Sequence, residues 1–462
     1  TPTLLIVGTC IPGYLPNFFL LHQKLQMCGT EEEMREVAGK ICRNYLHGAW
    51  KTVDPAQMLF RRISGGLSNF LYLVGLPDDP SKLSTYQRRE SSPEDEGDLD
   101  RKPFRSNSFT IEEPRKVLLR IYGQVHGERA MDAIVTESVI FTLLSERKLG
   151  PKLHGVFSGG RIEEYIPARP LLTKELADPA ISMKIAEKMA AIHSMAVPLS
   201  KDPDWLWKTC YKWLKTVKTE RLSGAVTGKV GLDIDNQIEL LTLGLDELDW
   251  LKKFIATVDS PVVFCHNDMQ EGWLYIPPSM VLNSPTPPCI VLFRPTSHSS
   301  FLDSHFPHST LYSEPRMVLI DYEYCAYNYR GFDIANHFQE WAYDYSNPEY
   351  PFYYERIEDL PTLEQKEIFI KEYLKHYYMT ATDDKSYEPT VDQINQLLSE
   401  VEAFELSSHL LWTLWSCVNA SKSQIPFGYW VIAEYILLII QSYKRFHRNV
   451  NYKTESSYKT SF

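Results

Sequence analysis

Two stretches of the chain end in acidic residues that could support phosphoryl transfer. Val262–Cys265 is an apolar, strand-forming run that leads to Asp268, and Val318–Ile320 leads to Asp321 and Glu323. If both runs are strands, the three carboxylates lie at the mouth of one sheet. Transfer of a phosphoryl group needs one carboxylate to orient the attacking hydroxyl and others to hold Mg²⁺ on the nucleotide phosphates. The pattern is therefore typical of a phosphotransferase.

Asp268 is the candidate to bind the substrate hydroxyl and accept its proton, mostly by orientation, because the transition state of phosphoryl transfer is loose. An aspartate that caps a turn is the alternative. Asp321 and Glu323 are separated by one residue, so strand alternation would put both carboxylates on one face, aimed at Mg²⁺. Gln270 could add a further oxygen ligand. His266 is better suited to brace the loop by hydrogen bonds than to take part in the reaction.

The residues around these acids resemble a known family. His266-Asn-Asp followed by a strand that ends in Asp is similar to the catalytic centre of protein-kinase-like phosphotransferases. The fuller motifs are similar to those of the choline/ethanolamine kinase family, closest to choline kinase: His266-Asn-Asp-Met-Gln-Glu-Gly272, Asp321-Tyr-Glu-Tyr324 and Asn328-Tyr-Arg-Gly-Phe-Asp-Ile334. The resemblance implies an α+β fold of two lobes, a small N-terminal β-sheet lobe and a large, mostly helical C-terminal lobe. It also implies transfer of the γ-phosphoryl group of ATP to choline in phosphatidylcholine biosynthesis. In that comparison Asp333 and Arg330 serve as loop braces.

The N-terminal part of the chain supplies the candidate nucleotide site. Met58–Val74 has the pattern of strand, glycine turn and strand, and the turn amides could cover phosphates; an ordinary Gly-Gly hairpin is the alternative. A strand with Arg120 and a helix with Glu137 follow, and in this order the two would form the ion pair that positions the phosphates, although each alone could be a surface charge. The resemblance adds an adenine hinge after the next strand. The candidate nucleotide residues are Ser64, Gly65, Gly66, Leu67, Ser68, Asn69, Arg120, Glu137, Glu164, Tyr165 and Ile166.

Aromatic residues near an acid indicate how a quaternary ammonium group would be recognised. Such a cation has no N–H to donate, so ring faces and a nearby carboxylate must bind it. Trp412 and Trp415 are three residues apart on a predicted helix and share a face, a spacing that core packing also produces. A further family tyrosine is expected where this chain has Ile432, and Tyr429 is the nearest substitute. The resemblance to choline kinases places four residues around the ammonium group: Glu340, Tyr345, Trp412 and Trp415.

One position departs from the family pattern. The first motif of the family ends in a metal-binding asparagine, and this chain has Trp273, whose indole offers no lone pair to Mg²⁺. A Ser/Pro/His-rich block, residues 273–314, follows where family members have a much shorter hairpin. The block is either a gene-model artefact, or a genuine feature of a metal-impaired protein or a pseudokinase that binds choline. Retention of Asp268, Asp321 and Glu323 favours the artefact, because a decaying site should accumulate scattered losses.

Composition bounds the class of protein. The chain has 462 residues, 44% of them hydrophobic, which is enough for a large core in two lobes. A formal charge of -11 argues against nucleic-acid binding, and no basic run suggests a membrane-surface helix. Eight cysteines without a CxxC pair indicate a reduced, cytoplasmic protein. Thr3–Leu21 is uncharged, but Pro12 and Pro16 interrupt it, so we expect neither a signal peptide nor stable membrane insertion.

The predicted organisation has three parts. They are an N-terminal extension at 1–29, an ATP-binding lobe at 30–167 with a disordered acidic insert at 78–114, and a catalytic, choline-binding lobe at 168–462. Apolar periodicity predicts helices at 30–46, 131–147, 181–195, 205–217, 234–258, 331–345, 361–378 and 394–421. Choline is the expected small-molecule partner, with ethanolamine as the alternative, and the resemblance allows a homodimer.

Overall fold

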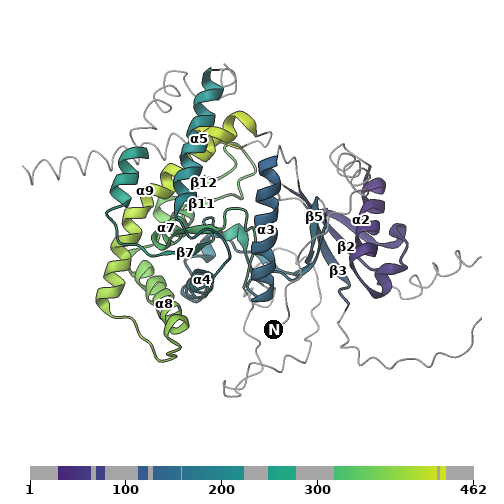
Figure 1. Cartoon of the computed structure of the whole chain (residues 1–462), viewed down its shortest axis with the longest axis horizontal. Coiled ribbons are helices and arrows are strands. Elements are labelled where there is room, and N and C mark those ends of the chain that lie inside the picture. Colours follow the sequence, from purple (N-terminus) through teal and green to yellow (C-terminus); the bar gives the residue numbers. More distant parts are fainter. Residues whose placement is uncertain are drawn as a thin grey trace, which may run out of the picture. The chain divides into compact units, whose positions relative to one another are not determined.

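The chain forms two compact units, Thr1–Ile166 and Pro167–Phe462. Figure 1 shows the computed structural model with its elements labelled. The predictions for the 1–29 extension, for the glycine turn at 64–68, and for most of the two inserts concern residues outside those described. The structure describes residues 30–63, 69–78, 113–122, 128–157, 159–222, 248–276, 317–423 and 427–432.

The first unit contains one five-stranded antiparallel sheet in the order β1-β2-β3-β5-β4. The last four residues of β3 and the first four of β5 are all buried, as expected for central strands that are covered on both faces. The strand predicted to carry Arg120 is β3, and in the pairing of β3 with β5 Arg120 lies directly opposite Arg161. The strands are β1 Leu59–Ile63, β2 Asn69–Gly75, β3 Lys116–Tyr122, β4 Leu153–Phe157 and β5 Gly160–Glu164.

Helices cover this sheet at positions that the sequence predicted. The helix α2, Glu31–Tyr45, begins after Thr30, whose side chain forms a capping box with Glu33. Trp50 is fully buried beside it, and its indole N–H donates to the Pro114 carbonyl at 2.7 Å. The other elements of this unit are α3 Glu128–Glu146 and the 3-10 helices η1 Gly48–Lys51 and η2 Pro55–Gln57.

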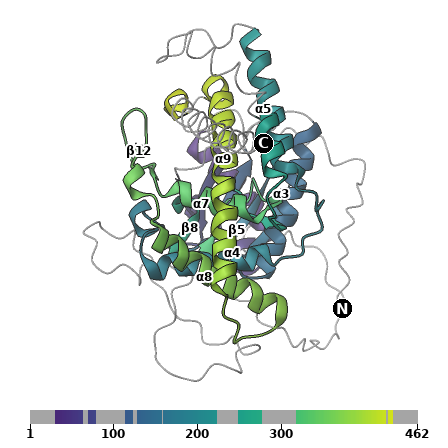
Figure 2. The ribbon, with the colours of Figure 1, turned by 90° about the vertical axis from the view of Figure 1, so that its left-hand side faces the viewer.

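The second unit is mostly helical. Its longest described helix, α9, packs against α5, α7 and α8, while α4 packs against α8. Figure 2 shows α9 in yellow-green with α8 beside its lower part. Of the helix predicted at 234–258, the structure describes residues from 248 onward, which are helical to 255. The helices are α4 Pro179–His193, α5 Asp204–Leu222, α7 Arg330–Glu340, α8 Leu363–Thr382 and α9 Val391–Lys422, with 3-10 helices η5 Thr173–Glu175, η6 Glu271–Trp273 and η8 Ile357–Asp359.

Short antiparallel sheets lie among these helices. The strand β7 precedes the first acidic motif and pairs with β10, which precedes α7. In a separate sheet, β8 pairs with both β6 and β9. The two acidic stretches therefore leave different sheets, not one sheet as predicted, because each strand finds its partner elsewhere in the chain. The strands are β6 Arg169–Pro170, β7 Val262–Cys265, β8 Leu274–Ile276, β9 Val318–Leu319, β10 Ala326–Tyr329, β11 Tyr343–Asp344 and β12 Tyr354–Glu355.

Two further expectations are corrected. The helix predicted at 331–345 ends at Glu340, because the chain turns there and Tyr343–Asp344 pairs with β12. The strand before Asp321 ends at Leu319, and Asp321 has a left-handed backbone with φ of 65°. Strand alternation therefore does not position Asp321 and Glu323.

In the part of the chain that the structure describes, no helix is both long enough and apolar enough to cross a bilayer.

Candidate active site

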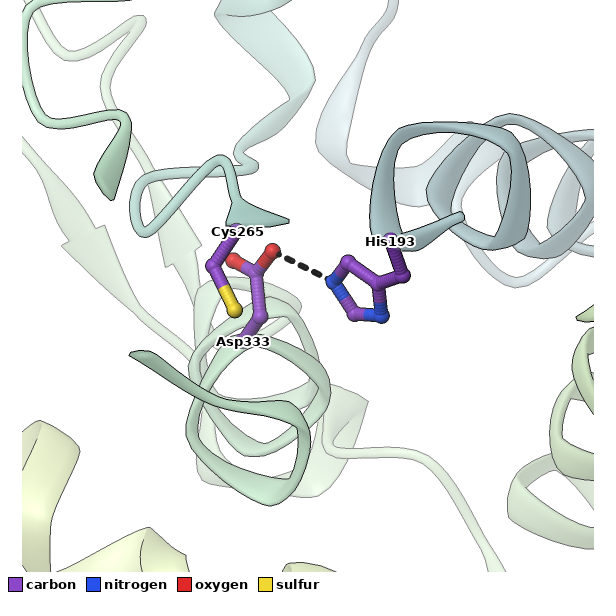
Figure 3. A group of neighbouring side chains, drawn as sticks. All are labelled: His193, Cys265 and Asp333. Atoms are coloured by element: carbon purple, nitrogen blue, oxygen red, sulfur yellow. Dashed lines mark hydrogen bonds and ion pairs between the residues drawn. The ribbon is translucent and has the colours of Figure 1, made fainter. Parts of the chain in front are cut away.

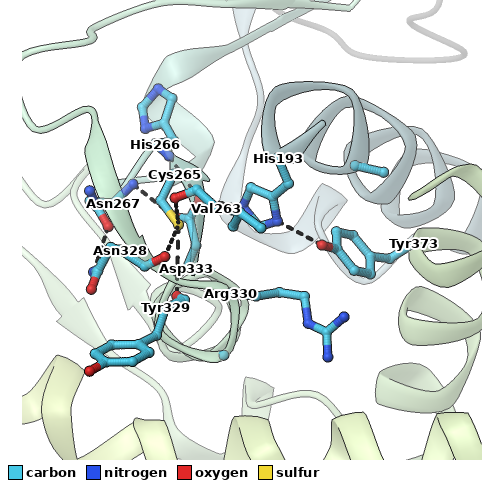
Figure 4. A network of polar contacts seen from close by, with 12 residues as sticks. His193, Val263, Cys265, His266, Asn267, Asn328, Tyr329, Arg330, Asp333 and Tyr373 are labelled. Carbon is cyan, nitrogen blue, oxygen red and sulfur yellow. Dashed lines mark hydrogen bonds and ion pairs between the residues drawn. The ribbon is translucent and has the colours of Figure 1, made fainter. Parts of the chain in front are cut away.

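A buried aspartate fixes the loop that carries Asp268. Asp333, in the first turn of α7, accepts the backbone N–H groups of His266 at 2.8 Å and Asn267 at 2.7 Å. Its carboxylate also accepts from His193 Nε2 at 2.9 Å, so His193 Nδ1 accepts from the Tyr373 hydroxyl at 2.8 Å. Figure 4 shows this network. The prediction that Asp333 braces the loop is confirmed.

The charge on Asp333 is stabilised in spite of complete burial. Burial alone would raise the pKa of this carboxyl, but the hydrogen bond from His193 and the neighbouring imidazoles lower it below its ordinary value. The loop needs this support because Asn267 has a φ of 67°, in the left-handed region. Arg330, the other predicted brace, joins α7 to α9 through an ion pair in which its Nη2 lies 2.6 Å from Glu400 Oε2.

Side-chain hydrogen bonds tie the two acidic loops together. His266 Nε2 donates to the Ile320 carbonyl at 3.1 Å, as its expected bracing role requires. Asn267 Nδ2 donates to the Tyr324 carbonyl at 2.9 Å, and Asn328 Nδ2 donates to Asn267 Oδ1 at 2.8 Å. These bonds hold the segment with Asp321 beside the segment with Asp268, although the segments leave different sheets.

The three predicted acids all act electrostatically on Tyr324. Burial raises the pKa of the Tyr324 hydroxyl well above its ordinary value, and the charges of Glu323, Asp268 and Asp321 raise it further. Asp268 is buried, Asp321 is half-buried and Glu323 is exposed. Tyr324 is thus an electrostatic neighbour that the three carboxylates share. The sequence analysis did not single out Tyr324 as a site residue, although it lies within the quoted motif Asp321-Tyr-Glu-Tyr324.

Tyr324 also touches the predicted tryptophan pair. Trp412 and Trp415 meet edge to face with ring centroids 5.7 Å apart, and Tyr324 meets Trp412 in the same way at 5.8 Å. The Trp415 indole N–H donates to the Tyr324 hydroxyl at 3.1 Å, and that of Trp412 donates to Asn336 Oδ1 at 2.5 Å. The two rings therefore meet on one face of α9, as the spacing of three predicted, and their hydrogen bonds fix their orientations.

The ring cluster continues through Tyr429 to two residues that the sequence did not single out, Phe427 and Tyr353. Tyr429 lies 5.6 Å from Trp415 and 4.9 Å from Phe427, measured between ring centroids. Phe427 in turn lies 6.3 Å from the predicted Tyr345 and 5.4 Å from Tyr353. Tyr429, which the sequence offered as a substitute for the tyrosine missing at Ile432, belongs to this cluster. Phe427 and Tyr353 are distant in sequence, so no spacing could have indicated them.

Two buried acids, Glu340 and Glu271, interact electrostatically with each other, and Glu340 also interacts with Asp268. Glu340 accepts from the Tyr345 hydroxyl at 3.0 Å, and burial, followed by the charges of Asp268 and Glu271, raises its pKa well above the ordinary value. Burial raises the pKa of Glu271 to about 7, although hydrogen bonds from its own backbone, from Gly272 and from Thr173 act against this. Among the described residues, neither Glu340 nor Glu271 has an ion pair with a basic side chain. Such a pair of acids favours a bound cation.

The predicted ion pair between Arg120 and Glu137 is replaced by a four-residue chain in the first unit. Arg120 Nε donates to Glu163 Oε1, Arg161 Nε donates to the same oxygen, and Arg161 donates to Glu137 Oε1, each at 2.7 Å. The arginines lie opposite each other on β3 and β5, and Glu163, two residues after Arg161, shares their face. The ion-pair partner of Glu137 is therefore Arg161, which shares Glu163 with Arg120.

Arg161 is held from several sides. Its guanidinium lies 4.4 Å from the Phe141 ring centroid and donates to the Tyr122 hydroxyl at 3.2 Å. Burial opposes its charge, but Glu163 and Glu137 outweigh that effect and raise its pKa. Of the predicted hinge, Glu164 ends β5 and its carboxylate accepts the Lys152 backbone N–H at 2.9 Å, while Tyr165 and Ile166 are half-buried.

A second cluster of potential metal ligands has a structural role. Ligand atoms of His193, Cys265 and Asp333 all lie within 4.8 Å of one another (Figure 3). Both nitrogens of His193 already have partners, and the Cys265 thiol is within 3.6 Å of the Asn328 carbonyl, to which it can donate. Burial, with the charge of Asp333, raises the pKa of Cys265 well above its ordinary value. A neutral thiol in a satisfied network is a brace and not a metal centre.

The fold and the site together define a phosphotransferase of the two-lobed protein-kinase-like class, as predicted. A solved choline kinase from Cryptosporidium parvum Iowa II has this fold, with a TM-score of 0.62 and 22% identity over 90% of this chain and 97% of that one. Residues 60–439 match the family model "Choline/ethanolamine kinase", and the chain belongs to the choline/ethanolamine kinase family.

Curated relatives agree with this membership. The human choline/ethanolamine kinase is 39% identical over 388 residues, which cover 84% of this chain and 80% of that protein. Choline kinase A2 of Caenorhabditis elegans is 37% identical over 404 residues, which cover 87% and 83%. Membership thus identifies a kinase of phospholipid biosynthesis, as predicted, without choosing between choline and ethanolamine.

Proposed function

We propose that this protein transfers the γ-phosphoryl group of ATP to the hydroxyl group of choline. The observation that carries the proposal is the ring cluster of Tyr324, Trp412 and Trp415, which adjoins the acidic loops, together with the buried Glu340, which interacts electrostatically with Asp268. Ring faces attract a quaternary ammonium group through their quadrupoles, and a carboxylate adds Coulomb attraction. Relatives named choline kinase or choline/ethanolamine kinase support ATP as the phosphoryl donor and choline as the acceptor.

Each side chain then has a defined task. The rings and Glu340, held by Tyr345, bind the ammonium end of choline, and Asp268 binds its hydroxyl group and accepts the proton as the new bond forms. Because the transition state is loose, orientation by Asp268 matters more than its basicity. The brace of Asp333 on the preceding backbone keeps this carboxylate in place.

Mg²⁺ suits the remaining acids. Asp321, Glu323 and Gln270 offer carboxylate and amide oxygens, the hard ligands that Mg²⁺ prefers, and Asp321 and Glu323 both act on Tyr324 electrostatically. When bound, Mg²⁺ neutralises charge on the transferred phosphoryl group. We assign the nucleotide itself to the glycine turn at 64–69, to Arg120 with its ion-pair chain, and to the backbone of Glu164–Ile166.

Trp273 favours a second candidate function. An indole replaces the amide that the family uses for metal, so a protein that binds choline without Mg²⁺-dependent turnover is the alternative. We also propose a cytoplasmic location and a homodimer. The five cysteines that the structure describes are all free thiols, which supports a reducing compartment.

A coupled assay of ATP consumption on the full chain, with Mg²⁺ and either choline or ethanolamine, tests the proposal. We expect turnover of choline and a loss of at least roughly 100-fold in Asp268→Asn, because a positioned base contributes about 10²–10⁴-fold. Asp392→Asn, an exposed helical aspartate, is the matched control and should retain full activity. A chain with Trp273→Asn and a shortened 273–314 block runs in parallel. Choline binding by calorimetry without turnover in either chain would establish the second candidate instead.

A further inference from the structure

Asn336 joins α7 to one tryptophan of the ring cluster. It is fully buried, and its Oδ1 accepts from the Trp412 indole N–H at 2.5 Å and from the Ser408 hydroxyl at 2.7 Å. An indole N–H can only donate, so the atom of Asn336 that faces Trp412 must be the amide oxygen. The amide Nδ2 is then enclosed without a hydrogen-bond partner among the described residues. A buried donor of this kind lowers stability, so an asparagine suits this position only if its oxygen has a task.

The ring that Asn336 holds is accessible. Trp412 is half-buried, and so are Tyr324 and Trp415, whose ring centroids lie 5.8 and 5.7 Å from that of Trp412. Each of these three residues keeps part of its surface open, while the indole N–H of Trp412 is anchored in the core. The hydrogen bond fixes the rotation of the indole about its side-chain torsions. The attraction of a cation to an aromatic ring depends on that rotation, because the cation must lie over the ring face.

The helix α7 also supports the catalytic loop. Asp333 lies one turn before Asn336 on this helix, and its carboxylate accepts the backbone N–H groups of the two residues that precede Asp268. One helix therefore holds both the loop of the carboxylate that binds the substrate hydroxyl and a ring of the ammonium site.

We propose that Asn336 is a positioning residue, which holds the Trp412 indole in the orientation that binds the ammonium group of choline. Asn336 acts through the ring and does not touch the substrate. This inference rests on the proposed function of the site. It assigns the acceptor at position 336 a role in choline affinity, in addition to its place in the packing between α7 and α9.

Replacement of the acceptor tests the proposal. Asn336→Leu removes the acceptor at nearly equal volume, and we expect the Kd for choline to rise roughly 3- to 30-fold, the range of one cation–π contact, at an unchanged Kd for ATP. Asn336→Asp keeps an acceptor oxygen whether or not it is ionised, so its Kd for choline should stay within about 3-fold of wild type. Ser408→Ala removes the other donor to the same oxygen and is the matched control, with an unchanged Kd for both ligands.

A double-mutant cycle separates positioning from a general effect on the fold. Trp412→Phe keeps a ring but has no N–H, so in this background Asn336→Leu should change the Kd for choline by less than about 2-fold. An equal rise in the two backgrounds would overturn the inference. A rise in Asn336→Asp as large as that in Asn336→Leu would also overturn it.

The chain without substitutions gives a test that does not depend on the folding of any leucine variant. In a chain with ¹⁵N-labelled tryptophan, the indole signal of Trp412 is the one that Trp412→Phe lacks. We expect this proton to stay protected from exchange with water when choline is bound, and rapid exchange in the bound state would overturn the inference. Calorimetry and exchange need no turnover, so a chain that binds choline without phosphorylating it refutes the kinase activity alone. A chain that binds no choline refutes both proposals.

Discussion

Asp333→Asn tests whether the catalytic loop depends on one buried carboxylate. The wild-type side chain accepts three hydrogen bonds, of 2.7, 2.8 and 2.9 Å, from Asn267, His266 and His193. In the variant, one of the two oxygens becomes an NH₂ group that cannot accept. If this group replaces Oδ1, the Asn267 N–H loses its acceptor. If it replaces Oδ2, His193 can change tautomer and accept from it, but the His266 N–H is left without a partner.

At least one buried backbone N–H is therefore orphaned in either orientation. The lost charge-assisted bond contributes about 1.5–3 kcal/mol, and the unsatisfied donor costs about 1–3 kcal/mol. We expect the free energy of unfolding to fall by roughly 3–5 kcal/mol, which is typical of breaking a buried charged network. Displacement of Asp268 by the relaxed loop should also lower kcat by about 100-fold, with a smaller change in the KM for choline.

Urea unfolding followed by tryptophan fluorescence measures the stability, and the coupled assay measures kcat and KM on the same preparation. Asp392→Asn, an exposed aspartate in the first turn of α9, serves as the control. The reasoning is refuted if Asp333→Asn unfolds within 1 kcal/mol of wild type (about the value of one ordinary hydrogen bond) and retains full kcat.

Three further perturbations follow from named contacts. Arg161→Lys keeps a charge but loses the planar fork that bridges two glutamates. We therefore expect the free energy of unfolding to fall by about 2 kcal/mol or more, and the KM for ATP to rise while the KM for choline stays unchanged. Equal rises in the two KM values would contradict this. Gly331→Ala places a methyl group 2.6 Å from Phe404 Cδ2. Overpacking of this kind lowers the free energy of unfolding by roughly 1–3 kcal/mol, which urea unfolding measures. An unchanged urea midpoint would show that α9 can shift to accept the methyl group. Burial lowers the pKa of His409 from 6.5 to about 4, so the unfolded chain binds its proton first. Stability should therefore fall by about 3 kcal/mol as the pH drops through that window, and by less in His409→Leu; equal pH slopes would exclude this histidine.

The sequence by itself determined the local elements and the type of chemistry. A capping box at Thr30 set the start of α2, and a run of strand-forming apolar residues indicated β3, because these signals act between residues within a few positions of each other. The acids of the two motifs and the spacing of Trp412 and Trp415 also stand in the sequence. They indicated a phosphotransferase with an aromatic cation site before any long-range contact was known.

Only the tertiary structure decided which distant groups meet. Periodicity tells which face of an element is buried but not against which partner, so Arg161 and not Arg120 received Glu137. The left-handed backbone of Asp321 likewise lies in a loop whose position depends on hydrogen bonds from a segment more than fifty residues earlier. Tyr324 contacts Trp412 and Trp415 for the same reason: contacts between residues far apart in the chain arise from packing, which no local pattern encodes.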